Sequence, residues 1–266
     1  MLGPVELLQR RFWAQAHARP AADAVDVLIA KKVCGSVARP VAEALAGNVR
    51  GFRLGANSLE LDDRGLDSAG RSSRLDEAAR WLLQAGFVRA WRNEKIEVRH
   101  EPHSPVLAQI DRCAVRVLGI TTWSVHLNGY TADGQLVVGR RAAHKRVDPG
   151  LWDNLAGGIV AAGESLRDAL VREAHEEAGL ELQGLLVQEG ARILVRRPIR
   201  EGTLSERVHV FDVQLPAGTC PSNRDGEVER FETRPIALVL ASIERGEFTV
   251  EAALATLDSL KRRGHK

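Results

Sequence analysis

The stretch that decides the fold runs from Gly158 to Leu180 and reads GIVAAGESLRDALVREAHEEAGL. Ser165 followed three residues later by Asp168 is a capping box that stands directly before an apolar periodic run. Gly179 lies where a residue in the left-handed conformation would end a helix. The stretch therefore predicts a loop, a helix over about residues 166–178 and a second loop.

Glu173, Glu176 and Glu177 share one side of this expected helix. At about 100° per residue they fall within one arc of roughly 100°, over the apolar side of the helix. The opposite side is expected to carry Asp168, Arg172 and His175. Acids at this spacing repel one another, and partial burial adds to the cost, so an ordinary solvent-exposed helix does not explain the placement. A divalent cation removes the repulsion, and clustered carboxylates favour Mg²⁺ or Mn²⁺.

The same stretch resembles the Nudix box, in which Gly is followed after five residues by Glu, after seven more by Arg-Glu, and then by Glu-Glu and Gly. The matching positions are Gly158, Glu164, Arg172, Glu173, Glu176, Glu177 and Gly179. Ala174 departs from the larger aliphatic residue that is usual there. The resemblance implies an α/β/α sandwich around a mixed sheet, and hydrolysis of a diphosphate linked to another moiety.

The resemblance also implies which groups hold the metal ions. These would be the carboxylates of Glu173, Glu176 and Glu177, together with the carbonyl of Gly157 and an acid from a later loop. The segment DGEVERF, residues 225–231, offers Glu227 and Glu229 for that acid, on one face of an expected strand, and Glu227 is preferred.

Catalytic roles follow from the same resemblance. Glu164 and Arg172 would pair to orient the acids of the helix, and Glu173 is taken as the base, although family members differ in where the base lies. Bound metal ions would neutralise charge on the diphosphate and acidify the attacking water, and a glutamate would complete its deprotonation.

A basic run precedes the box. Residues 140–146 read RRAAHKR, and we expect Arg140 and Lys145 to bind the phosphates of the substrate. A solvated strand end explains such a run equally well. Arg196, Arg197 and Arg200 form a second, weaker basic group.

Three further runs, VHLNGY at 125–130, DNLAGGI at 153–159 and DGEVE at 225–229, resemble a Nudix subfamily with an N-terminal extension. That extension is related to the module fused ahead of thiamine pyrophosphokinase, and Ala156, where most Nudix proteins have Pro, fits this subfamily. The resemblance covers the chain from about Gly51 onward. It implies a small-molecule diphosphate substrate, thiamine diphosphate or its damaged analogues, cleaved to the monophosphate and inorganic phosphate.

Other functions stay open. An ADP-ribose or nucleoside diphosphate derivative would favour an aromatic stacking partner, and Trp123, Tyr130 and Trp152 are the candidates, although each fits the core as well. A non-catalytic Nudix ligand sensor is a second alternative, which the intact acids disfavour. Isopentenyl diphosphate isomerase chemistry lacks a suitable cysteine context in this sequence.

Composition bounds the class of protein. The 266 residues, 44% hydrophobic and 27% charged, exclude a disulfide-stapled mini-protein and a disordered chain. A net charge of +2 argues against non-specific nucleic-acid binding, and no apolar run reaches membrane-helix length. Cys34, Cys113 and Cys220 are widely spaced and are expected to be reduced. We expect a cytoplasmic protein without membrane partners, and the sequence leaves a homodimer open.

Periodicity and turn residues predict two domains, an N-terminal α+β module over 1–115 and a Nudix domain over 116–266. His100 and His103, beside two prolines, are interpreted as part of a polar linker rather than a metal site. The helices expected are 4–15, 39–46, 75–85, 236–244 and 250–262, besides 166–178. The strands expected are 49–54, 87–91, 96–99, 123–127, 135–141, 191–195 and 208–214, with a hairpin turn at Asp133-Gly134.

Overall fold

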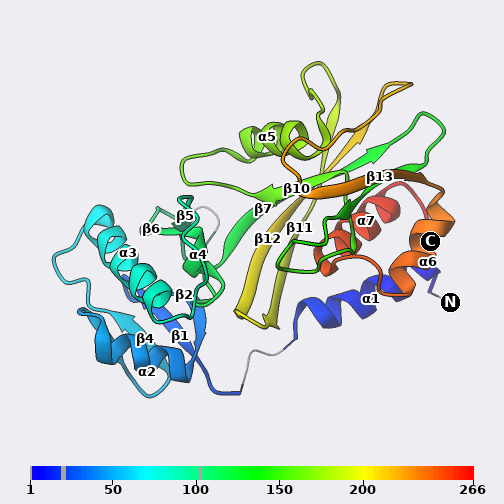
Figure 1. The fold of residues 1–266 in the computed structure, drawn as a ribbon. Helices are drawn as coiled ribbons and strands as arrows, with labels where there is room; N and C mark the ends of the chain where they lie inside the picture. Colours follow the sequence, from blue (N-terminus) through cyan, green and yellow to red (C-terminus); the bar gives the residue numbers. More distant parts are fainter. Residues whose placement is uncertain (1, 19–21, 102–103) are drawn as a thin grey trace.

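A computed structural model describes residues 2–18, 22–101 and 104–266, which form two modules side by side (Figure 1). The elements of the N-terminal module are β1 (Ala24–Ile29), β2 (Lys32–Ala38), α2 (Arg39–Asn48), β3 (Phe52–Leu54), β4 (Ser58–Leu61), α3 (Ser68–Gln84), β5 (Lys95–Val98), β6 (Ala108–Asp111) and α4 (Arg112–Val115). The C-terminal module contains α1 (Pro4–Ala16), β7 (Thr122–Tyr130), β8 (Leu136–Arg141), β9 (Trp152–Asp153), β10 (Ala156–Ile159), α5 (Leu166–Ala178), β11 (Val187–Ile199), β12 (Gly202–Gln214), β13 (Val228–Arg234), α6 (Ile236–Glu244) and α7 (Val250–Arg262).

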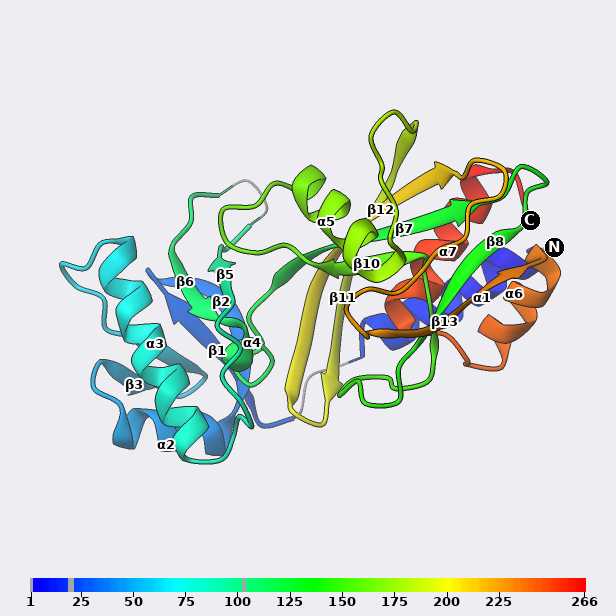
Figure 2. The same cartoon turned by 45° about the horizontal axis from the view of Figure 1, so that its top comes forward.

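The sheet of the C-terminal module is mixed and has helices on both faces. Its strand order is β11-β12-β7-β8-β13, with β10 paired to β7 and β9 to β8. β12 runs parallel to β7, and the other pairs are antiparallel. Along β8, Val137 packs with α5, whereas Leu136 and Val138 pack with α1, α6 and α7, as alternation along a strand requires. The two views agree with this layering, which confirms the expected sandwich (Figures 1 and 2).

The N-terminal module is an α+β unit with its own core, as expected. Its main sheet has the order β2-β1-β4-β3, and β5 and β6 form a second, two-stranded sheet. Leu45 of α2, Leu82 of α3 and Ile96 of β5 are fully buried in one cluster with the strands of the main sheet. The module therefore has a hydrophobic core of its own.

Helix α1 crosses from the first residues of the chain to the C-terminal module. Val5, Leu8 and Phe12 are buried in the cluster that contains α6 and α7. In the opposite direction, Leu118 and Ile120 are buried in the N-terminal core. The division into residues 1–115 and 116–266 stays a proposal, and the packing departs from it on both sides.

Most of the expected elements are present, and the departures have local causes. α3 begins seven residues before the expected start because Asp67 caps it, accepting a hydrogen bond from the Gly70 amide at 2.8 Å. The strand expected over 87–91 is absent, since the amides of Phe87 and Val88 close the end of α3 on the carbonyl of Leu82. β11 and β12 extend well beyond the ranges expected for them, and β3 covers only the end of its range.

Three smaller expectations can be followed in the structure. Cys34, Cys113 and Cys220 are all free thiols. The His100 ring lies 2.9 Å from the carbonyl oxygen of Val33, and His103 lies outside the described residues. No helix in the described part of the chain is long and apolar enough to cross a bilayer.

The placement of α1 predicts that Phe12→Ala destabilises the C-terminal module. Removing a fully buried phenylalanine costs about 3–5 kcal/mol in the free energy of unfolding, measurable by urea denaturation. Leu7→Ala on the same helix is the control, because that side chain is 55% exposed. Equal effects of the two substitutions would contradict the burial of α1.

Candidate metal and catalytic site

Helix α5 has the bounds that its caps predict. The Ser165 side chain accepts a hydrogen bond from the Asp168 amide at 3.1 Å, and Gly179 ends the helix in the left-handed region at φ 64°. The next residues of the chain turn back toward the sheet, because the Leu180 amide donates to the carbonyl of Ala174. These local contacts fix both ends of the helix that carries the carboxylates.

Two of the three acids of α5 are buried against β10. Glu173 and Glu177 are each 8% exposed, and Glu176 is partly exposed. The Gly157 amide donates to Glu177 Oε2 at 2.9 Å. The Glu173 carboxylate lies so close to the Cα of Gly158 that a methyl group on this residue would overlap it. The missing Cβ of Gly158 thus lets the Glu173 carboxylate lie against the strand backbone.

Arg172 lies among the acids, and the expectation that it occupies the opposite side of the helix is wrong. Its guanidinium donates to Glu164 at 2.8 and 2.9 Å, to Glu173 at 2.7 Å and to Glu176 at 3.2 Å. The Cα direction of Arg172 is only about 40° from that of Glu176, and its long side chain folds over that gap. The ion pair with Glu164 that the resemblance implied is therefore present.

Two of the buried acids of α5 have raised pKa values, because the positive charge near them does not offset the cost of burying a carboxylate. It raises the pKa of Glu177 to about 8, with the nearby carboxylates of Glu173 and Asp153 adding to the shift. Burial also raises the pKa of Glu173, against the opposing pull of Arg172. Burial opposes but does not prevent a lowered pKa at Glu164, because Arg172 and a backbone amide hydrogen-bond to it. The uncompensated acids favour a cation beside Glu177.

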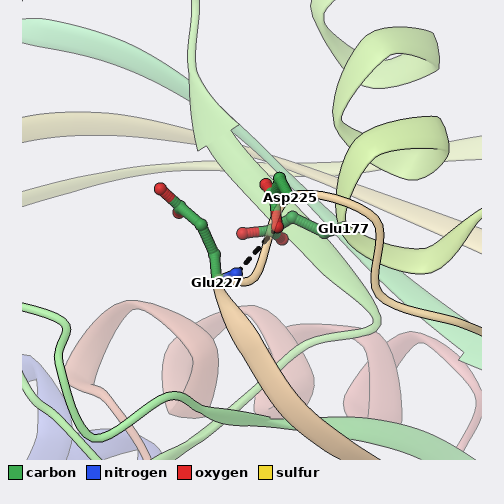
Figure 3. A group of neighbouring side chains, drawn as sticks. All are labelled: Glu177, Asp225 and Glu227. Carbon is green, nitrogen blue, oxygen red and sulfur yellow. Dashed lines mark hydrogen bonds between the residues drawn. The ribbon is translucent and has the colours of Figure 1, made fainter.

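A loop far along the chain brings more carboxylates to Glu177. Carboxylate oxygens of Glu177, Asp225 and Glu227 all lie within 4.8 Å of one another (Figure 3). Asp225 Oδ1 accepts from the Glu227 amide at 2.8 Å, and burial raises the pKa of Asp225. Glu229 instead pairs with Arg230 at 2.8 Å. An all-carboxylate set of this kind fits Mg²⁺ or Mn²⁺.

The sequence interpretation named Glu227 and missed Asp225. A signal for it was present, since Asp225 precedes Gly226, whose φ of 84° makes the turn that aims both acids at α5. The expected strand alternation between Glu227 and Glu229 does not hold, because Glu227 lies before β13 and the pairing with β8 is irregular between Val228 and Arg230.

The residues of the basic run at 140–146 lie in different places and have different partners. The Lys145 ammonium forms an ion pair with Glu227 and so lies at the acidic site. Arg140 faces away from that site toward Glu229, with Nε 3.6 Å from its carboxylate, and its guanidinium lies near the Trp152 ring. Arg141 pairs with Asp153 at 2.8 Å and holds the loop after β8.

Comparison with known proteins identifies a known domain in each half of the chain. The model of the NUDIX domain matches residues 129–249, and the model of a domain of unknown function, DUF4743, matches residues 7–122. The chain contains a Nudix domain. Its Nudix domain contains all the acids described above and is preceded by the N-terminal extension that the sequence led us to expect.

Relatives cover both parts of the chain. Nudix hydrolase 20, chloroplastic, of Arabidopsis thaliana is 31% identical over 73% of this chain and 53% of its own length. The uncharacterized protein YJR142W of Saccharomyces cerevisiae is 28% identical over 80% of this chain and 68% of its own. The crystal structure of DR0079 from Deinococcus radiodurans, 28% identical, covers 65% of this chain and 100% of its own with a TM-score of 0.50. The chain spans about half the length of the Arabidopsis relative.

The N-terminal module contacts the Nudix loop that leads into α5. The Ala162 amide donates to the carbonyl of Lys95 at 2.8 Å, and the Gly163 amide donates to Glu97 Oε1 at 3.2 Å. Arg99 holds the Glu97 carboxylate at 2.8 Å. Strand β5 therefore fixes the loop immediately before Glu164, a contact that sequence reasoning did not anticipate.

The overlap at Gly158 predicts that Gly158→Ala displaces the Glu173 carboxylate. Mn²⁺ affinity, followed by electron paramagnetic resonance titration, should fall by roughly 10- to 100-fold, as for other residues that orient metal ligands. Gly47→Ala is the control, because an added methyl group there meets nothing within 4 Å. Unchanged Mn²⁺ affinity in Gly158→Ala would contradict a metal site at Glu173.

The contact with β5 predicts that Glu97→Ala frees the Nudix loop. Loss of this hydrogen bond should speed amide exchange at Gly163 by about fivefold, because one such bond contributes about 1 kcal/mol. Glu97→Gln keeps a carbonyl acceptor and should exchange like the unmodified protein. Equal exchange in all three proteins would show that Glu97 does not hold the loop.

Proposed function

We propose that the protein is a metal-dependent pyrophosphohydrolase of a diphosphate-linked small molecule, acting by attack of water on phosphorus. The observation that carries the proposal is the convergence of Glu173 and Glu177, both buried, with Asp225 and Glu227 from a distant loop. Such a set of acids costs stability unless a cation and its phosphate partner occupy the site.

The residues that would hold the metal ions are the three acids of α5, the carbonyl of Gly157, and Glu227 with Asp225 beside it. Bound Mg²⁺ or Mn²⁺ would supply charge neutralisation on the diphosphate and a more acidic water. Glu173 is the proposed base, and burial, which raises its pKa, suits a carboxylate that accepts a proton. Arg172 orients Glu173, and Glu164 in turn fixes Arg172.

Lys145 is the proposed phosphate-binding residue of this chain. Its ammonium lies against Glu227, and burial lowers its pKa, so it is a cation held at the edge of the acidic site. Arg140 is kept as a second phosphate-binding residue with less support, because it lies with Glu229 and Trp152. Substrate phosphates would compete with these carboxylates for both cations.

The proposed substrate is thiamine diphosphate or one of its damaged analogues, which rests on the three sequence runs that resemble the subfamily with an N-terminal extension. Hydrolysis of ADP-ribose or a nucleoside diphosphate derivative is the alternative. Of the residues considered for stacking a base, Tyr130 and Trp152 are buried in the core, and only Trp123 is partly exposed. A ligand sensor without turnover is the remaining alternative, and a homodimer and a cytoplasmic location stay predictions.

Phosphate release in the presence of Mg²⁺ tests the substrate. Thiamine diphosphate and its oxidised analogues should yield the monophosphate and inorganic phosphate, whereas ADP-ribose, nucleoside triphosphates and dinucleotides should be turned over at least about tenfold more slowly in kcat/KM. Faster turnover of ADP-ribose would replace the thiamine proposal. Tight binding without any turnover would establish the sensor.

Glu176→Gln and Glu177→Gln should each reduce kcat by at least about a hundredfold, because lost metal stabilisation of the transition state is worth several kcal/mol. Neither variant should melt at a lower temperature than the unmodified apoprotein, measured in EDTA, because each removes a charge that no cation offsets there. Glu181→Gln is the matched control, since this glutamate pairs with His175 on the exposed side of the helix. Near-normal turnover in both site variants would reject the proposed mechanism.

A further inference from the structure

A cleft of about 600 Å³ lies where the two modules meet. On the N-terminal side it is lined from α2 and the turn after α3, and on the other side from the tip of the β11–β12 hairpin. Both views show this tip beside β1 and β2 (Figures 1 and 2). The volume is typical of small-molecule sites, which occur preferentially at such interfaces.

The cleft carries an excess of positive charge. Arg89, Arg146 and Arg200 line it and are exposed, while Glu201 is the one acidic side chain among its described lining residues. Within the described residues these three arginines have neither a hydrogen bond nor an ion pair. By contrast, Arg197 of the same hairpin is neutralised by Asp148 at 2.8 Å. The guanidinium groups of the cleft are therefore available to an anion.

An apolar surface accompanies the charge. Phe87 is 40% exposed, and the hydrogen bond from its amide to the Leu82 carbonyl at 2.9 Å fixes the turn that presents it. Val41 and Ile199 add aliphatic surface from the two sides of the cleft. An aromatic ring beside aliphatic side chains offers a flat contact for a planar group.

We propose that this cleft binds a ring-bearing organic phosphate. Planar guanidinium groups match phosphate oxygens with paired hydrogen bonds, and Phe87 receives the ring. The cleft shares no lining residue with the acids at α5, so this is a second site. The two sites are linked along the chain, because Arg146 lines the cleft and the preceding Lys145 contacts Glu227.

Isothermal titration with AMP in EDTA tests the proposal, because chelation empties the metal-dependent site. The unmodified protein should bind AMP saturably, and adenosine or inorganic phosphate alone should bind at least about tenfold more weakly, since each offers only part of the ligand. The double variant Arg89→Ala with Arg200→Ala should weaken AMP binding by at least about tenfold. Phe87→Ala should weaken AMP binding and leave phosphate binding unchanged.

The matched control is Arg10→Ala with Arg192→Ala, which removes the same charge from two exposed arginines outside the cleft. This control should bind AMP within about twofold of the unmodified protein, and melting temperatures verify that all variants fold. Absence of saturable AMP binding, or equal losses in the two double variants, would overturn the proposal. Neither result bears on hydrolysis at α5, which is measured separately with Mg²⁺.

Discussion

Two carboxylates held out of water against a strand backbone are the constraint on which the site depends. Glu177 accepts a hydrogen bond from the Gly157 amide, and the Glu173 carboxylate occupies the space that a Cβ at Gly158 would take. Burying an unpaired carboxylate costs several kcal/mol. Arg172 offsets part of this cost, yet the pKa of Glu177 remains near 8. A cation bound at the C-terminal half of α5 would therefore stabilise the fold.

The strand that receives these acids is itself fixed by buried polar contacts. Gly157 is in register with His126 on β7, and the His126 ring lies 2.8 Å from the side-chain oxygen of Asn154. Asn154 donates to Asn128 at 2.7 Å. Burial alone would lower the pKa of His126, but Glu206 and Asp153 raise it to about 9. A satisfied network of this kind specifies one position for β10, and hence for the acids.

The sequence predicted what is local and missed what the chain brings together from afar. The caps and the 3.6-residue period of α5 lie within one stretch, so its bounds and the shared side of Glu173 and Glu177 could be inferred. Asp225 is brought to Glu177 by the turn at Gly226. The expected strand alternation wrongly placed Glu227 and Glu229 on one face and gave no role to Asp225. The sequence places helix α1 in the first module by its position in the chain. Its apolar period shows that one side is buried, but not against which core that side packs.

Three cationic residues in and around the 142–150 loop have different partners, although the net charge of the chain is close to zero. Lys145 contacts the acids, Arg141 ties the start of the 142–150 loop to Asp153, and Arg197 ties its end to the β11–β12 hairpin through Asp148. The loop is therefore fastened to the active site and to the hairpin whose tip lines the cleft between the modules. A displacement of that hairpin must either break the Arg197–Asp148 pair or carry the loop with it. In the second case Lys145 moves relative to Glu227, which makes this loop a direct physical connection between the cleft and the acids of α5, beside the contact of β5 with the loop before Glu164.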